Sequence, residues 1–149
     1  EEGDVVRIDV IGAFEGYQYD VLRTTFIGDP PSDILKILNL CAEATEAAVG
    51  TCMPGVKSHE IYRASQKIFE REGCGDHSRA FMGHGIGLET VEFPLIQKGV
   101  EDELKEGMVL CIEPGISIPK VAGACIEEEI IVRSSGPELI THAPTRPWL

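Results

Sequence analysis

The stretch VVRIDVIGAFEGYQYDVLRTTFI, residues 5–27, decides the fold, because two β-rich runs flank a short glycine-containing segment. Residues 5–11 alternate and are β-branched, residues 12–16 include turn formers, and residues 17–27 are again aromatic and β-branched. Alternation over such lengths is typical of half-buried strands, and two strands around a short turn indicate a β-hairpin. The sequence therefore predicts an antiparallel hairpin over residues 5–27.

Two amphipathic helices are predicted after this hairpin. Asp29-Pro30-Pro31 breaks the chain, and Ser32 is expected to cap a helix that ends at Gly50. Ser58 is expected to cap a second helix that runs until Gly73. Apolar residues recur at helical spacing in both segments, so each helix should bury one face. They are Ile34, Leu35, Leu38, Cys41, Ala42, Thr45 and Val49 in the first segment, and Ile61, Ala64, Ile68 and Phe69 in the second.

Beyond the second helix the pattern changes to short strands and glycine-rich turns. Residues 108–114 and 124–132 are candidate strands, and residues 83–87 contain three glycines. The sequence shows no internal repeat, low-complexity tract or linker, so residues 1–149 are expected to form a single domain. The order of hairpin, two helices and several strands predicts an α+β fold, with the helices on one face of an antiparallel sheet.

Charge and composition exclude several classes of function. The 149 residues include 13 Lys and Arg against 25 Asp and Glu, which gives a formal net charge of −12. Nucleic acids and anionic membranes require a basic patch, so neither is an expected partner. Apolar residues make up 43% of the chain, enough for a core, but no run approaches the roughly 20 apolar residues of a membrane span.

The five cysteines are odd in number, include no C-x-x-C pair and lie mostly in apolar stretches. Buried thiols in a reducing compartment are therefore expected rather than a disulfide framework. Since the sequence also shows no secretory signal pattern, a cytoplasmic location is predicted. Trp148 is expected to pack on the surface or on a partner.

Two aspartates of the hairpin are candidate metal ligands. Paired residues in a hairpin have numbers with a constant sum, so a turn centred between Phe14 and Glu15 would place Asp9 directly opposite Asp20. Two carboxylates about 5 Å apart repel each other unless a cation lies between them. A bulge that turns one aspartate to solvent is the open alternative.

The same arithmetic pairs two glutamates. Glu113 and Glu127 share a midpoint at Lys120, within a turn-like segment, and both interrupt apolar runs. An ionised carboxylate in a buried strand is costly unless it is paired or binds a metal. Glu128 and Glu129 follow directly, and at least one acid of this run is expected to face outward. The pairing selects Glu127 as the candidate ligand.

His84 completes the candidate set. It lies in Gly83-His84-Gly85-Ile86-Gly87, where the glycines keep other side chains away from the imidazole, although such a histidine is also common as a plain turn residue. Four acids and one neutral histidine offer mainly oxygen donors, which suits Mn²⁺ or Mg²⁺, with Co, Fe or Zn as alternatives. Four carboxylates exceed the need of one divalent ion. Two divalent ions that share bridging carboxylates and activate a water for hydrolysis are therefore predicted.

These residues lie in motifs that resemble those of the pita-bread metallopeptidases, which include methionine aminopeptidases, proline-specific aminopeptidases, prolidases and creatinase. The matching stretches follow the family's order and spacing over nearly the whole chain, and the proline-specific branch looks more similar than the methionine branch. They are residues 3–9, 16–24, 83–89, 107–115 and 126–127. The resemblance implies a pita-bread fold and a homodimeric, dinuclear-metal hydrolase of the Xaa-Pro dipeptidase or aminopeptidase type.

The resemblance also implies a role for each site residue. Asp9 would chelate one metal ion, and Asp20 and Glu127 would bridge two. His84 and Glu113 would complete the second metal site, and Glu113 would help to take a proton from the bridging water. Glu113 and His84 are thus the candidate catalytic residues, and all five positions carry the family's residue types.

Two departures from the family pattern qualify this expectation. Peptidases of the family carry a histidine in a G-L-x-x-H-E-x-P segment, where it helps to hold the scissile carbonyl, whereas this chain has Val91 at that place. Catalytic domains of the family are also longer. Residues 1–149 are therefore expected to be the C-terminal portion of such a domain, with the N-terminal half missing.

Two alternative functions stay open at this point. Relatives without the histidine include enzymes that act on small osmolyte-like amides or sulfonium compounds, so one alternative is a non-peptidase enzyme of the same fold. The other is a binding module without catalysis, as in histone-chaperone and growth-regulator relatives, although such modules usually lose metal ligands. Metal content would separate the binding module from both enzymes.

Overall fold

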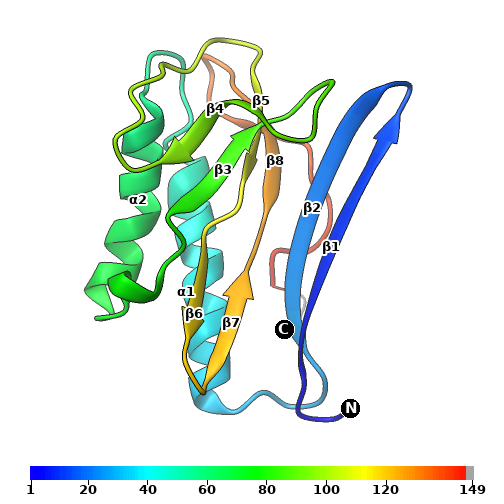
Figure 1. The fold of residues 1–149 in the computed structure, drawn as a ribbon, viewed down its shortest axis with the longest axis vertical. Coiled ribbons are helices and arrows are strands. Elements are labelled where there is room, and N and C mark those ends of the chain that lie inside the picture. Colours follow the sequence, from blue (N-terminus) through cyan, green and yellow to red (C-terminus); the bar gives the residue numbers. More distant parts are fainter. Residues whose placement is uncertain (147–149) are drawn as a thin grey trace.

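The computed structural model describes residues 1–146, and Figure 1 shows their arrangement. The expectation for Trp148 lies outside the described residues. The elements follow the predicted order of hairpin, helices and short strands, which confirms the α+β class. They are β1 (Val5–Phe14), β2 (Tyr17–Phe26), α1 (Ser32–Val49), α2 (Ser58–Arg71), a short 3-10 helix (Gly75–His77), β3 (Phe81–Gly85), β4 (Glu92–Gln97), β5 (Val109–Ile112), β6 (Gly115–Ile118), β7 (Ala122–Cys125), β8 (Glu128–Ile131) and β9 (Glu138–Leu139).

The strands form three antiparallel groups. Five strands pair in the order β4-β3-β5-β8-β9, β6 pairs with β7, and β1 pairs with β2 in a two-stranded ribbon, called the ribbon below. Both helices lie on one side of the sheet, and the ribbon stands on the other side (Figure 1). Buried apolar side chains of the helices and of the sheet, among them Leu38, Phe69 and Leu110, form one core.

Residues 109–131 make a long antiparallel hairpin, called the buried hairpin below. β5 pairs with β8 and β6 pairs with β7, and in both pairs the partners are symmetric about Lys120. Glu113 and Glu127 lie in the short interruption between the two pairs, at symmetric positions. The register predicted for this hairpin is therefore confirmed.

The ribbon differs from its predicted register. Asp9 lies opposite Leu22, two residues beyond Asp20, so the aspartates are diagonal neighbours and the prediction that they oppose each other directly is wrong. The turn consists of Glu15 and Gly16, with φ of 52° and 90°, and positive φ at both residues is typical of a two-residue hairpin loop. A shift by two residues retains the alternation of side chains. Both aspartates therefore still share one face of the ribbon.

Both helices begin at the serines that were expected to cap them. Ser32 is the first residue of α1 and Ser58 is the first residue of α2, so neither is a cap. In α2 the Glu60 carboxylate accepts the backbone N–H of Lys57 at 3.0 Å, the reciprocal half of a capping box. This contact fixes the start of α2 without a serine cap.

Helix α1 also fixes the strand that leads to Glu127. The Thr45 hydroxyl lies 3.0 Å from the carbonyl oxygen of Ile126, and the Cys41 thiol donates to the carbonyl oxygen of Ala124 at 3.4 Å. Since side chains alternate along a strand, Ile126 packs in the core and Glu127 points to the opposite side. The helix layer thus positions Glu127 on the side of the ribbon.

Candidate metal centre

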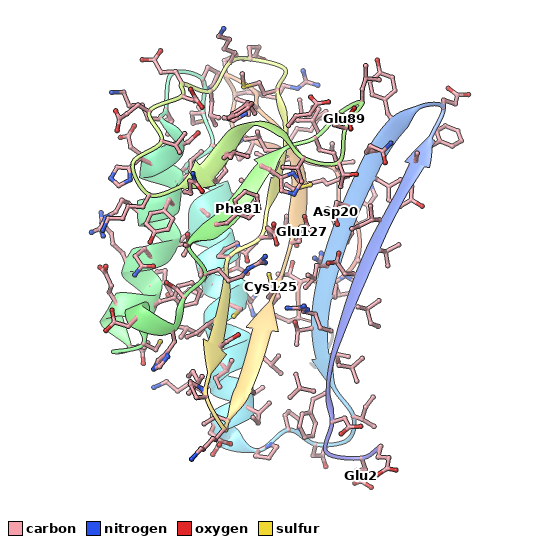
Figure 2. The ribbon with its side chains drawn as sticks, in the orientation of Figure 1. Glu2, Asp20, Phe81, Glu89, Cys125 and Glu127 are labelled. Atoms are coloured by element: carbon pink, nitrogen blue, oxygen red, sulfur yellow. The ribbon has the colours of Figure 1, made fainter. Side chains whose placement is uncertain are left out.

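The five predicted site residues come together where the ribbon meets the sheet. Two come from the ribbon, two from the interruption of the buried hairpin, and one from β3. Figure 2 shows Asp20 and Glu127 between β2 and β8. Asp9 is exposed, whereas the other four side chains are buried: Asp20, His84, Glu113 and Glu127.

Potential ligand atoms form two groups that overlap at Glu127. Carboxylate oxygens of Asp9, Asp20 and Glu127 all lie within 4.8 Å of one another. A ring nitrogen of His84, the sulfur of Cys111 and a carboxylate oxygen of Glu127 also lie within 4.8 Å of one another. A carboxylate that bridges two ions must lie close to the other ligands of both ions, and Glu127 meets this requirement. The structure thus places Glu127 at the middle of the candidate centre.

The ring of His84 is oriented by its own strand. Its Nδ1 lies 2.9 Å from the carbonyl oxygen of Gly85, and because a carbonyl can only accept, Nδ1 is the nitrogen that carries the proton. In the neutral ring Nε2 then keeps its lone pair, and it lies 3.8 Å from Oε1 of Glu113. Metal-ligating histidines use their second nitrogen in the same way. His84 is therefore oriented as a ligand.

Arg79 is a candidate functional residue that the sequence analysis missed. Its Nη1 donates to Oε2 of Glu113 at 2.5 Å and lies 3.3 Å from the sulfur of Cys125. This ion pair holds one oxygen of Glu113, while the other oxygen faces His84. No spacing rule signals Arg79, since the contact depends on how distant strands pack.

Two buried carboxylate oxygens of the centre lack a partner. Within residues 1–146, neither Oδ1 of Asp20 nor Oε1 of Glu127 receives a hydrogen bond. A buried carboxylate oxygen without a donor is costly, and a divalent cation held by oxygen ligands would supply the missing interaction. The residues present therefore fit the divalent ions that the sequence predicts.

Burial and mutual repulsion favour the protonated forms of several groups. Desolvation, followed by contact with Asp9, raises the pKa of Asp20 to about 6. Desolvation, followed by the charges of Asp20 and Glu113, raises the pKa of Glu127 to about 9. Desolvation, followed by the charge of Glu127, also raises the pKa of the Cys111 thiol well above its ordinary value. A bound cation would oppose these shifts, because it favours the charged forms.

The acids that follow Glu127 are both buried, so the expectation that at least one faces outward is wrong. Glu128 forms an ion pair with Nη2 of Arg23 at 2.8 Å, and Oε1 of Glu129 accepts the backbone N–H of Asp20 at 2.8 Å. Arg23 also donates to the backbone carbonyl of Glu127. Partners from the ribbon thus hold one oxygen of each neighbour, although Oε2 of Glu128 has no hydrogen-bond partner among residues 1–146.

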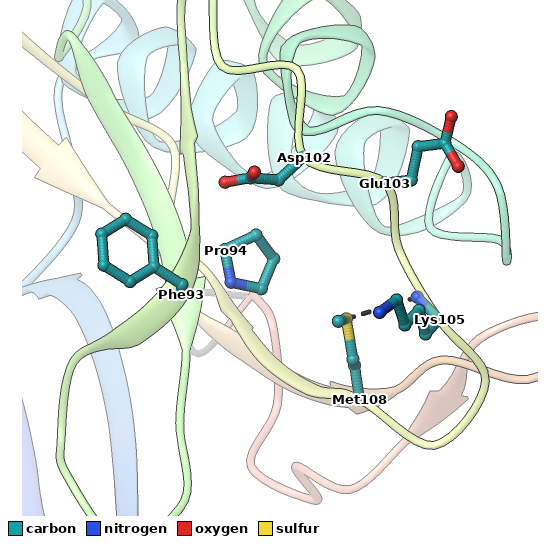
Figure 3. Close-up of a pocket in the computed structure, with 6 residues that line it drawn as sticks. All are labelled: Phe93, Pro94, Asp102, Glu103, Lys105 and Met108. Carbon is teal, nitrogen blue, oxygen red and sulfur yellow. Dashed lines mark hydrogen bonds between the residues drawn. The ribbon is translucent and has the colours of Figure 1, made fainter.

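A separate hollow of about 390 Å³ lies beside β4 (Figure 3). It is lined by Phe93, Pro94, Asp102, Glu103, Lys105 and Met108. None of the five candidate ligands lines this hollow. Buried, convergent groups with shifted pKa values lie instead at the metal centre, which makes the centre the stronger functional-site candidate.

Two further expectations concern the chain as a whole. All five cysteines are free and buried, as predicted. None of the helices in residues 1–146 has the length and apolar character needed to cross a membrane. The homodimer and the cytoplasmic location stay predictions.

Known proteins match this chain over most of its length. The family model described as metallopeptidase family M24 matches residues 1–134. The Xaa-Pro dipeptidase of Pyrococcus furiosus is 38% identical over 95% of this chain and 40% of its own length. The chain therefore spans about 40% of the length of the curated relatives it matches.

Solved structures share the fold. The dipeptidase PepE of Mycobacterium ulcerans superposes with a TM-score of 0.93 at 36% identity, covering 97% of this chain and 39% of that protein. The N-terminal domain of the FACT complex subunit SPT16 from chickpea superposes with a TM-score of 0.89 at 23% identity, covering 97% of this chain and 37% of that one, and shows the fold alone. The predicted pita-bread fold is thereby confirmed.

Proposed function

Because the chain belongs to metallopeptidase family M24, we propose that it carries the dinuclear metal centre of a hydrolase that cleaves Xaa-Pro dipeptides. The observation that carries this proposal is the shared position of Glu127 in two groups of potential ligands. A single carboxylate common to two groups supports two ions with a bridging ligand rather than one ion.

Each proposed ligand has a place in this arrangement. Asp9, Asp20 and Glu127 would hold one ion. His84 and Glu113 would complete the second site, with Asp20 and Glu127 as the bridging residues. Manganese is the first choice, since four carboxylates provide mainly hard oxygen donors.

Residues of this chain also orient Glu113 as a proton acceptor. When bound, the two ions would supply an activated water and a polarised scissile carbonyl. Arg79 holds Oε2 of Glu113, which leaves Oε1 to accept the proton of the water. The hydrogen bond from Nδ1 of His84 to the carbonyl oxygen of Gly85 leaves Nε2 facing Glu113, where it would ligate a metal ion.

The presence of valine at position 91 affects the rate expected for cleavage of Xaa-Pro dipeptides. Its side chain is 54% exposed and cannot donate a hydrogen bond, whereas the family histidine at this place would hold the scissile carbonyl. Losing one donor to a developing oxyanion costs roughly 10² to 10³ in rate. We therefore expect slow cleavage of Xaa-Pro dipeptides.

A substrate panel tests the proposal. The full-length protein that contains this chain is loaded with Mn²⁺ and assayed on Xaa-Pro dipeptides, a small amide and a sulfonium compound, beside its Val91→His variant and the matched Val91→Ala variant. We expect slow dipeptide cleavage that rises roughly 10²-fold or more in Val91→His and stays unchanged in Val91→Ala. Failure of both forms on every Xaa-Pro dipeptide would overturn the peptidase proposal.

The same residue supports one alternative. A substrate that develops no oxyanion near Val91 does not need the histidine, which favours a non-peptidase enzyme acting on a small amide or sulfonium compound. Turnover of such a compound, without dipeptide cleavage, would establish this second function. A binding module without catalysis is less well supported, because all five proposed ligands are present.

The assembly of the whole protein is part of the proposal. We propose that residues 1–149 act as the C-terminal portion of a pita-bread catalytic domain, which the 40% share of the relatives' length supports. A homodimer in the cytoplasm is likewise proposed, and sedimentation of the purified protein would test its oligomeric state.

A further inference from the structure

Cys111 occupies the middle of the sheet at the candidate centre. It lies on β5, directly opposite His84 on β3 and directly opposite Glu129 on β8. Directly paired residues point to the same face of a sheet, so the cysteine shares the face of His84. The Cys111 side chain is fully buried, which places its sulfur inside the centre rather than at its rim.

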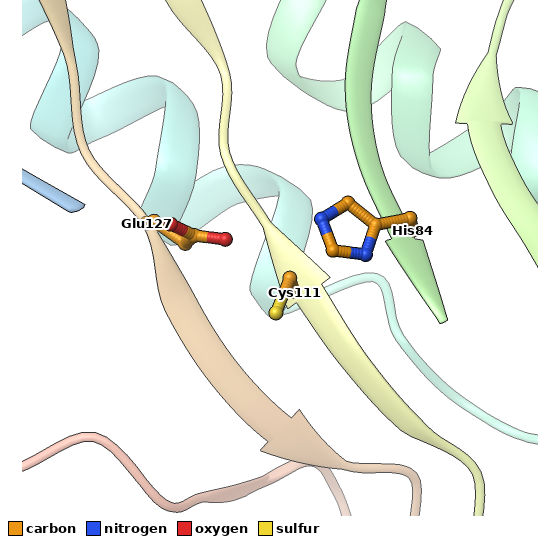
Figure 4. A group of neighbouring side chains, drawn as sticks. All are labelled: His84, Cys111 and Glu127. Carbon is orange, nitrogen blue, oxygen red and sulfur yellow. The ribbon is translucent and has the colours of Figure 1, made fainter. Parts of the chain in front are cut away.

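The sulfur of Cys111 lies within 4.8 Å of both a ring nitrogen of His84 and a carboxylate oxygen of Glu127. Figure 4 shows the three side chains together, with Cys111 between the other two. Within residues 1–146, Oε1 of the buried Glu127 carboxylate has no hydrogen-bond partner, so this carboxylate has an oxygen available to a cation. The three groups therefore surround a position that one cation could occupy after a small closure of the side chains.

The thiol itself is only weakly engaged. It donates to the backbone oxygen of Asp20 at 3.9 Å and to Oε1 of Glu129 at 4.0 Å, and both distances are at the limit for a sulfur hydrogen bond. The remote thiol of Cys41, in contrast, donates to a carbonyl oxygen at 3.4 Å. Among residues 1–146, Cys111 thus makes no short hydrogen bond that would hold its sulfur.

We propose that Cys111 supplies a sulfur ligand to the His84 side of the metal centre, which makes the two sites chemically different. This inference rests on the proposed function, because it assumes that divalent ions bind at Glu127. Ligation forms a metal–sulfur bond and releases the thiol proton to solvent. The Asp9 side then offers oxygen donors alone, whereas the His84 side offers nitrogen, sulfur and oxygen.

The consequence is a difference in metal preference. Thiolate and imidazole ligands favour Zn²⁺ and Co²⁺, whereas carboxylates suit Mn²⁺ and Mg²⁺. We expect the His84 side to select the softer ions and the Asp9 side to accept the harder ones. A mixed pair of metals, one soft and one hard, is then the expected loading when both kinds are supplied.

Cobalt spectroscopy tests the sulfur ligand directly. The chain is titrated with Co²⁺ in the absence of oxygen, and absorption is recorded in the visible region and in the near ultraviolet. Visible ligand-field bands report any bound Co²⁺, and a near-ultraviolet charge-transfer band reports a thiolate ligand. We expect both kinds of band in the unmodified chain.

Matched cysteine variants assign the charge-transfer band. It should vanish in Cys111→Ser and persist in Cys125→Ser, whose thiol is also buried but contacts Arg79 and Glu113 instead. Visible bands without a charge-transfer band in the unmodified chain would overturn the inference and leave the proposed metal centre intact. Absence of every cobalt band would instead contradict the proposed function.

A second measurement covers the case in which Cys111→Ser fails to fold. Competition between Zn²⁺ and Mn²⁺ is measured for the unmodified chain and for Cys111→Thr, which retains the approximate size of the side chain. Loss of the sulfur should weaken Zn²⁺ binding roughly tenfold or more and leave Mn²⁺ binding nearly unchanged. Equal losses for the two ions would contradict a sulfur ligand.

Discussion

The ribbon and the buried hairpin each supply two carboxylates to the candidate centre, but they hold them differently. Glu113 and Glu127 are buried in the interruption of the buried hairpin, whose strands pack against β3 and the helices. The ribbon contacts the sheet through hydrogen bonds, such as the Glu127 N–H to the Leu22 carbonyl at 3.0 Å, and through the buried Leu22 side chain, but its Asp9 is exposed. The hairpin therefore holds two buried ligands, whereas the ribbon holds one buried and one exposed ligand.

The two regions are also expected to contribute differently to the stability of the chain. Regions with few buried apolar contacts open at a lower free-energy cost than core strands. Ile8, Val10 and Phe14 on the ribbon are exposed, whereas Leu110 and Ile130 of the buried hairpin are completely buried. Side chains on the exposed face of the ribbon are therefore expected to contribute less to stability than those of the buried hairpin.

The largest expected effect is on metal binding. Glu127→Gln removes the carboxylate common to both ligand groups, so we expect the chain to lose both ions. Asp9→Asn, at the exposed ribbon position, should lose only one ion and keep the other. Elemental analysis after dialysis against Mn²⁺ measures the number of ions bound to each variant.

Glu128→Gln is the matched control for Glu127→Gln. Glu128 is adjacent and also buried, but it pairs with Arg23 and not with the centre. It should lower stability and leave the number of bound ions unchanged. Equal losses of metal in Glu127→Gln and Asp9→Asn would show that the ribbon and the hairpin hold the ions alike.

The second effect is on stability. Leu110→Ala removes a fully buried side chain of the buried hairpin and should cost about 2 to 5 kcal/mol. Val10→Ala on the exposed face of the ribbon should change stability by about 0.5 kcal/mol or less. Urea denaturation of the metal-free chain measures both. Similar losses at the two positions would mean that the ribbon is as firmly packed as the hairpin.

The same contrast explains what the sequence predicted. Glu113 and Glu127 were paired correctly because a single turn, centred on Lys120, sets their register. The ribbon's register was displaced by two residues because its loop is Glu15-Gly16 rather than a turn centred one residue earlier. A rule that places glycine at the second loop position would have found it. The shared face of the two aspartates was nevertheless correct, since alternation survives an even shift.

Other features of the site depend on tertiary packing. Arg79 reaches Glu113 only because the segment before β3 packs beside β6, and no local pattern reports that packing. Cys111 reads as an ordinary buried thiol until the pairing of β3 with β5 places it opposite His84. Neither residue could be assigned from spacing along the chain.

The third effect is on the pH dependence of the metal-free chain. The pKa of Asp20 is raised to about 6 and that of Glu127 to about 9, both from ordinary values near 4. Between its ordinary pKa and its raised pKa, each carboxyl group keeps its proton in the folded state but has lost it in the unfolded state. The free energy of unfolding therefore falls as pH rises from about 4 to 9.

Urea denaturation across this pH range checks the sign. The midpoint should decrease with rising pH in the metal-free chain, and Glu127→Gln should remove most of the decrease above pH 7. With Mn²⁺ present the slope should reverse, because protons compete with the metal for the same carboxylates. A midpoint that rises with pH in the absence of metal would contradict the raised pKa values.

The smallest effect concerns the turn of the ribbon. Whether Gly16→Ala lowers or raises stability tests the register of the two strands. Gly16 has a φ of 90°, which a side chain with a Cβ resists, so Gly16→Ala should cost about 1 to 2 kcal/mol. In the register with Asp9 directly opposite Asp20, Gly16 would instead be a strand residue, and alanine would stabilise the chain by roughly 0.5 to 1 kcal/mol. Gly16→Asn should be milder than Gly16→Ala, because asparagine tolerates a positive φ. Thermal denaturation therefore distinguishes the two registers, since a gain in stability in Gly16→Ala would exclude the Glu15-Gly16 loop.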